Sequence, residues 1–206
     1  MAEKEARTVI FDITKPLPRR IEFEGRKYAL DLSFNRVLDV YDLLQEKELF
    51  DEDKTAMALA ILVKEKNPPP MILRKIFDEY LSITNKPRKN AGLRTVDFRQ
   101  DGVYLYSSFI HDYGIDLVKA RNRLHWWEFV SLFQGRSENT KMREVMRIRS
   151  QKIPERNKHN SEYIENLLEL KSYYALELSQ EEREKNFKKG LANLAEVLKA
   201  RAKNND

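Results

Sequence analysis

The stretch Leu124 to Trp127, Leu-His-Trp-Trp, carries the side chains best suited to chemistry. A histidine in an apolar pocket acts as a general base when a carboxylate orients it. Glu128 follows His125 by three residues on the same predicted helix, and Asp116 is also near in sequence. The alternative is that the tryptophans anchor a core and His125 is hydrogen-bonded at its edge. We favour this alternative, because adjacent tryptophans diverge by about 100° on a helix and one of them can pack inside.

The sequence lacks the residue spacings that are typical of helical zinc sites and of nucleophilic active sites. The three histidines are His111, His125 and His159, and no two are separated by the four residues of a helical zinc site. Two carboxylate pairs have the spacing to hold Mg²⁺ in a nuclease, Asp97 with Asp101 and Asp112 with Asp116, although caps and solvated helix faces explain them equally well. Cysteine, Walker-type loops and nucleophile elbows are absent from the sequence. We expect no catalytic residue, no metal and no cofactor.

The composition indicates one helical domain with a large solvated surface. Of the 206 residues, 41% are hydrophobic and 34% are charged. Lys plus Arg is 38 and Asp plus Glu is 33, so the net charge of +5 arises from mixed charges of both signs. The basic stretch 141–158 is interpreted as a helix face that is solvated or paired with acidic side chains. We do not expect nucleic acid as a partner, because a protein that binds it concentrates its excess positive charge more strongly. No apolar run approaches the roughly 18 residues of a membrane span, and the N-terminus does not resemble a secretory signal, so we expect a soluble intracellular protein.

The elements that must position these residues are mostly helices. Strands are predicted over 8–13 and as a hairpin over 21–32, where apolar residues alternate around the turn Glu-Gly-Arg-Lys. Apolar periodicity predicts helices over 34–44, 51–66 and 70–83, the last two separated by Asn-Pro-Pro-Pro. The fold class is therefore α+β and mostly helical, with an N-terminal β-hairpin, a helical core and a C-terminal helical pair.

The second half is predicted to be entirely helical. The polar segment after residue 83 suggests the division 1–83, a linker at 84–96, a helical core at 97–155 and a C-terminal pair at 156–206. Helices are predicted over 95–113, 122–135, 137–151, 157–178 and 179–203. In the first helix, Tyr106 is among the positions expected to face the core, and Gly114 forms the C-cap. Gly102 inside this helix is expected to destabilise it by roughly 1 kcal/mol relative to alanine.

The C-terminal pair is predicted from two apolar stripes. The first comprises Ile164, Leu167, Leu168, Tyr174 and Leu178. The second is a narrow seam on a charged helix, comprising Phe187, Leu191, Leu194 and Leu198. A seam this narrow is typical of a helix that packs on another helix.

The motifs of residues 97–149, named here the signature segment, match a family pattern. They are Asp97-Phe98, Asp101, Ser107 to Phe109, Tyr113 to Leu117, Leu124 to Trp127, Phe129, Gly135, Thr140 and Ile148-Arg149. The segment resembles a family of tail-assembly proteins from long-tailed (siphovirus) bacteriophages of Gram-positive bacteria. Residues 23–44 resemble that family's opening hairpin and first helix, and the chain beyond about residue 155 resembles it less.

The resemblance implies a non-enzymatic chaperone in the host cytoplasm. Such proteins are encoded beside the tape-measure protein and keep it soluble while the tail tube polymerises. The implied partners are the tape-measure protein, a second copy of the chain, a second tail-assembly chaperone and tail-tube subunits. Two alternatives stay open, a structural tail or connector protein retained in the virion and a nucleic-acid-binding protein.

Contact chemistry for such a partner would consist of aromatic anchors inside a charged rim. The candidates are Tyr104, Trp127, Phe133 and the seam Phe187, Leu191, Leu194 and Leu198. Core packing is the competing interpretation of the three aromatic side chains. The residues expected to form the signature core are Phe98, Phe109, Tyr113, Gly114, Asp116, Leu124, His125 and Trp126.

Overall fold

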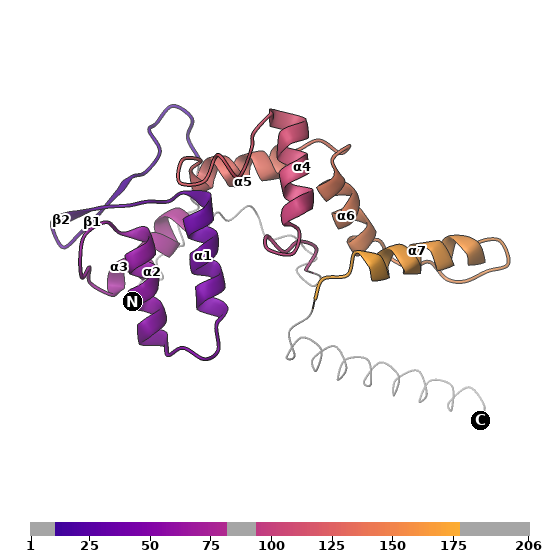
Figure 1. Ribbon diagram of the computed structural model, residues 1–206, viewed down its shortest axis with the longest axis horizontal. Helices are drawn as coiled ribbons and strands as arrows, with labels where there is room; N and C mark the ends of the chain where they lie inside the picture. The colour runs from indigo at the N-terminus through magenta and orange to yellow at the C-terminus, as the bar shows by residue number, and fades with distance from the viewer. Residues whose placement is uncertain (1–10, 82–93, 178–206) are drawn as a thin grey trace, which may run out of the picture.

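The computed structural model describes residues 11–81 and 94–177, and the predicted α+β, mostly helical class is confirmed (Figure 1). The elements are β1 (Arg20–Phe23), β2 (Arg26–Ala29), α1 (Phe34–Gln45), α2 (Asp51–Leu62), α3 (Met71–Ile76), the π-helix η1 (Phe77–Leu81), α4 (Gly102–Tyr113), α5 (Trp126–Gly135), α6 (Lys141–Ser150) and α7 (Ser161–Tyr173). The predicted linker falls largely, and the second C-terminal helix falls entirely, outside the described residues.

The hairpin of β1 and β2 is confirmed. Ile21 pairs with Tyr28 in antiparallel register, and both side chains are buried. The turn residues Glu24 and Gly25 have φ of 49° and 73°, the left-handed conformations that a two-residue hairpin turn requires. The predicted strand over 8–13 is wrong for its described part, because residues 11–13 are not in a strand and Asp12 accepts the Lys15 amide in a turn.

α2 ends earlier than predicted. The apolar pattern extended it to residue 66, but the helix stops at Leu62. Val63 instead forms an antiparallel bridge with Leu30, and the Lys64 amide donates to the Ala29 carbonyl. Backbone pairing with the hairpin therefore replaces the last helical turn. α3 was predicted to begin on Pro70, but Pro70 is its N-cap and the first helical residue is Met71; the helix continues as η1.

α4 starts later than predicted. The Asp97 carboxylate accepts the amides of Arg99 and Gln100, which holds residues 97–101 in a turn. Gly102 is therefore the first helical residue, and the expected cost of a glycine inside the helix does not arise. Gly114 caps the C-terminus with φ of 64°, as predicted, and the Ile115 amide donates to the carbonyl of Phe109.

One main core joins the two halves of the chain. It draws on the hairpin, on α1 to η1 and on α5, with Phe109 of α4 stacked on Phe129 of α5 at 5.3 Å. Figure 1 shows α5 between the N-terminal helices and α4. A smaller cluster of Val145, Ile148 and Tyr174 connects α6 and α7. Leu168 was predicted on the apolar side of α7, but 45% of it is exposed because that helix packs on one side only.

Candidate functional site

His125 lies at the N-terminus of α5, where it forms the helix cap. Its Nδ1 accepts the Trp127 amide at 3.1 Å, and the Glu128 carboxylate accepts the His125 amide at 2.9 Å. These two reciprocal bonds satisfy amides that the first helical turn leaves open. The predicted helix start at residue 122 is therefore wrong, since α5 begins at Trp126 and His125 has an extended backbone.

Both ring nitrogens of His125 are occupied by the fold. Nδ1 is an acceptor, so Nε2 carries the proton and donates to the Pro18 carbonyl at 3.2 Å. Burial lowers the pKa of His125 below its usual value, which favours this neutral form. The ring therefore has no free nitrogen to accept a proton from a substrate.

Backbone bonds beside the cap join α5 to the start of α1. The Trp126 amide donates to the Leu32 carbonyl at 2.7 Å, and the Phe34 amide donates to the Leu124 carbonyl at 3.0 Å. Ser33 and His125 are paired between these bonds. The Leu-His-Trp-Trp motif thus fixes the end of the hairpin to the signature segment.

The two tryptophans have different surroundings, as their helical divergence predicts. Trp126 is buried and stacks on Phe129 at 5.8 Å. Trp127 is half-buried, and its indole N–H donates to the Tyr80 carbonyl at 2.8 Å. The ring of Phe11 lies 5.9 Å from it. Trp127 therefore ties η1 to α5.

Asp101 and Arg149, which are 48 residues apart, form a buried ion pair between α4 and α6. Both guanidinium NH2 groups lie 2.7 Å from the carboxylate oxygens, and the side chains are 1% and 8% exposed. Arg149 also donates to the carbonyls of Tyr174 and Thr95. The Asp97 amide also donates to Asp101, so both carboxylate oxygens accept hydrogen bonds. Asp101 is thus committed to the fold and cannot complete the Mg²⁺ pair with Asp97.

Asp112, Asp116 and Tyr113 of the signature segment also form hydrogen bonds inside the molecule. Asp112 accepts the amide and hydroxyl of Ser137, which places its carboxylate in a different environment from that of Asp116. Asp116 accepts the amides of Val118 and Lys119, and these bonds lower its pKa. The Tyr113 hydroxyl donates to the Leu132 carbonyl at 2.8 Å. Over residues 11–81 and 94–177, no group of three or more histidine or acidic side chains is arranged to hold a metal ion.

The aromatic side chains proposed as partner anchors are partly buried. Tyr104 packs edge-on against Tyr174, with ring centroids 5.8 Å apart. Phe133 packs against Phe98 and lies under the Arg136 guanidinium at 3.9 Å. The seam Phe187, Leu191, Leu194 and Leu198 lies outside the described residues.

An exposed face of α4, which the sequence reasoning missed, carries no charged side chain. Val103, Tyr106 and Ile110 are 77%, 37% and 41% exposed and follow i, i+3, i+7 spacing. The expectation that Tyr106 points into the core is therefore wrong. Residues 102–110 contain no acidic or basic side chain, although 34% of the chain is charged. We name these three side chains the α4 face.

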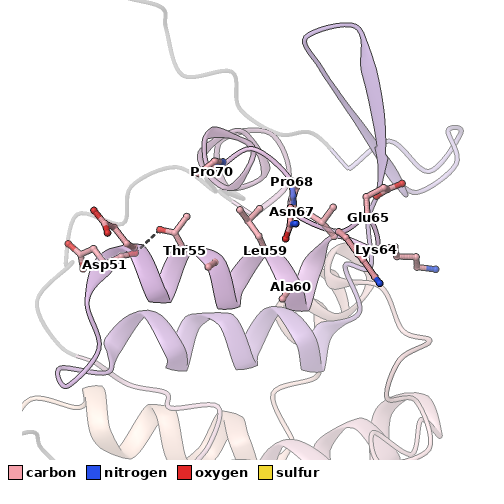
Figure 2. Close-up of a pocket in the computed structure, with 13 residues that line it drawn as sticks. Asp51, Thr55, Leu59, Ala60, Lys64, Glu65, Asn67, Pro68 and Pro70 are labelled. Atoms are coloured by element: carbon pink, nitrogen blue, oxygen red, sulfur yellow. Dashed lines mark hydrogen bonds between the residues drawn. The ribbon is translucent and has the colours of Figure 1, made fainter.

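A groove of about 740 Å³ runs along α2 (Figure 2). Leu59 and Val63 lie along it, and the exposed Ala56 and Ala60 form part of its lining. Figure 2 shows Pro68 and Pro70 on the other side, with Asp51 and Lys64 at its two ends. The groove is a second apolar recess, separate from the α4 face.

A family model for a bacteriophage protein matches residues 13–176, which is most of the chain. The chain belongs to the bacteriophage Gp15 protein family. The matched range includes the whole signature segment and the hairpin, so the bacteriophage origin implied by the resemblance is confirmed. No curated protein and no solved structure matched the chain in the corresponding searches.

The internal contacts of the signature segment lie within the range that the family model matches. Its His125, Asp101, Arg149 and Tyr113 side chains are all bonded within the fold. These side chains therefore stabilise the fold of this chain. Among the described helices, none is long and apolar enough to cross a bilayer.

Proposed function

We propose that this protein is a non-enzymatic tail-assembly chaperone, which binds the tape-measure protein in the host cytoplasm and keeps it soluble while the tail tube polymerises. Membership of a bacteriophage family and the tail-assembly resemblance of residues 97–149 support the biological setting. The observation that carries the binding role is the α4 face, because an uncharged apolar stripe on a heavily charged chain is the surface that an apolar helix would cover.

The size of the α4 face agrees with binding that is weak at each contact. A large side chain buries about 150–250 Å² when fully covered, and Val103, Tyr106 and Ile110 are 37–77% exposed. Together they offer a few hundred Å², below the roughly 800 Å² per partner of a stable interface. Several copies bound along one tape-measure chain would combine weak contacts into a stable coat. Each copy could still leave as tube subunits arrive.

The α4 face can be tested by placing a charge on it. Ile110→Glu puts a carboxylate on the exposed stripe without entering the core, and Met57→Glu makes the same kind of change on the exposed side of α2. Each variant would be co-expressed with the tape-measure protein, and the soluble fraction of the tape measure would be measured. We expect wild type and Met57→Glu to keep the tape measure soluble and Ile110→Glu to lose this effect.

Equal solubility of the tape measure with both variants would contradict the role of the α4 face. Failure of the wild type itself would contradict the chaperone role. Mass spectrometry of purified virions then distinguishes the remaining structural function, since a chaperone is absent from the finished particle and a tail or connector component is retained.

A further inference from the structure

A basic pocket lies at the end of α2 that adjoins the hairpin. It has a volume of about 500 Å³, and its cationic lining consists of Arg19, Arg20, Lys64 and Arg123. The one acidic residue in the lining, Asp31, forms an ion pair with Arg36 at 2.9 Å. The four cationic side chains are exposed, while Leu30 and Leu32 form a buried apolar floor. The pocket therefore suits an acidic segment that also carries an apolar side chain.

An acidic segment of this description lies at the opposite end of α2. Its carboxylates are Glu46, Glu48, Asp51, Glu52 and Asp53, and the two lysines of the segment are Lys47 and Lys54. Phe50 lies in the middle of the segment and is 80% exposed. The segment thus combines an excess of negative charge with an exposed aromatic ring, which matches the basic pocket in both respects. We name the two surfaces the acidic pole and the basic pole.

The two poles of one molecule are held apart by α2. Figure 2 shows Asp51 and Lys64 at opposite ends of this helix. The helix has twelve residues, which is about 18 Å at 1.5 Å per residue. Because α2 is one continuous helix that packs against α1, its ends stay this far apart, and a molecule cannot fold its acidic pole into its own basic pole.

We infer that the basic pole of one copy binds the acidic pole of a second copy, with Phe50 entering the pocket. Contact between two different surfaces of the same chain is heterologous, so it repeats from copy to copy and forms a row or a closed ring. Charge makes the association sensitive to salt, because Coulomb attraction between exposed groups is screened beyond the Debye length. This association is independent of tape-measure binding, since the α4 face takes no part in it.

Charge-removing variants at each pole test the inference on the full chain. Arg20→Ala with Arg123→Ala removes two cations of the basic pole. Asp51→Asn with Glu52→Asn removes two carboxylates of the acidic pole. The side chains of Arg20 and Arg123 form no hydrogen bond or ion pair among those found in the described residues. The exposed Asp51 carboxylate lies 3.8 Å from Lys54, and the Asp51 backbone carbonyl accepts from Thr55. Because an exposed ion pair contributes little stability, both double variants are expected to fold. Circular dichroism checks this.

Sedimentation velocity measures the result. Wild type is expected to associate beyond the monomer at about 50 mM salt and to dissociate at about 500 mM, where the Debye length falls below about 5 Å. Each double variant is expected to be monomeric at the lower salt. Their one-to-one mixture retains one intact pair of poles, so it is expected to form dimers and nothing larger. Arg147→Ala with Lys152→Ala, which removes two exposed cations elsewhere, is expected to associate like wild type.

Three results would overturn the inference. The first is a monomeric wild type at low salt. The second is association of either pole variant to the wild-type extent, which would assign self-association to another surface. The third is a mixture of the two pole variants that stays monomeric although the wild type associates.

Discussion

Replacement of Arg149 by methionine should destabilise the protein severely, although the residue lies far from the exposed surfaces. Methionine keeps much of the side-chain length and removes the charge together with its four hydrogen bonds. The Asp101 carboxylate, 1% exposed, would then be a buried charge without a cation. The carbonyls of Tyr174 and Thr95 would lose a donor as well.

The expected loss follows from the geometry of the pair. Breaking a buried ion pair by removing one partner costs about 3–5 kcal/mol, because the remaining charge stays uncompensated. Asp101→Asn removes the counter-charge of Arg149 and one of the two acceptors, because an amide nitrogen cannot accept a hydrogen bond. It should cost less than Arg149→Met, since Arg149 keeps its bonds to both carbonyls and to the asparagine oxygen. The double variant should lose less than the sum of the single losses, with a coupling energy of about 1–3 kcal/mol. Arg149→Lys should fall between wild type and methionine, because lysine cannot bind a carboxylate bidentately.

Urea unfolding followed by circular dichroism and tryptophan fluorescence gives the four free energies of this cycle. A loss below about 1 kcal/mol for Arg149→Met would contradict the buried ion pair, since a loss of that size is typical of an exposed pair. A coupling energy near zero would refute it equally, because the two side chains would then contribute independently.

Three further predictions concern single residues. The free energy of unfolding should fall between pH 7.5 and 5.5 in the wild type and fall less in His125→Asn. Burial lowers the pKa of His125, so on acidification the unfolded chain binds a proton below about pH 6.5 before the folded chain does. Asparagine is a suitable replacement because it also caps a helix. In urea unfolding, Trp126→Ala should cost about 3–5 kcal/mol, whereas Trp127→Phe should cost about 1 kcal/mol for the bond to the Tyr80 carbonyl. Gly114→Ala should cost about 1–2 kcal/mol in thermal unfolding because its φ is 64°. The first prediction fails if the wild type and His125→Asn lose equal stability on acidification. The second fails if Trp126→Ala and Trp127→Phe lower the free energy of unfolding equally. The third fails if Gly114→Ala melts at the wild-type temperature.

Local signals in the sequence were sufficient for the hairpin, α1 and the cap at Gly114. In each case the deciding interactions lie within a few residues of one another, as in the turn at Glu24 and Gly25. The errors occurred where distant backbone competed with helical periodicity. α2 was predicted too long because Val63 pairs with Leu30, a contact that spacing along α2 cannot show.

The candidate site was predicted less completely than the fold. His125 was placed inside a helix predicted to begin at residue 122, so its local cap bonds with Trp127 and Glu128 were missed. Its bond to the Pro18 carbonyl could not be predicted, because the two residues are distant in sequence. The ion pair of Asp101 and Arg149 could not be predicted for the same reason, since the two residues are 48 positions apart in the sequence. The absence of charged residues from 102–110 is visible in the sequence, but the apolar positions there were assigned to the core.

As a tail-assembly chaperone, this protein would bind one tape-measure chain in several copies. Light scattering during size-exclusion chromatography of the two co-purified proteins measures the mass of their complex directly. We predict a soluble complex whose mass corresponds to several copies of this chain for each tape-measure chain. A tape measure that aggregates while this chain elutes alone would contradict the account.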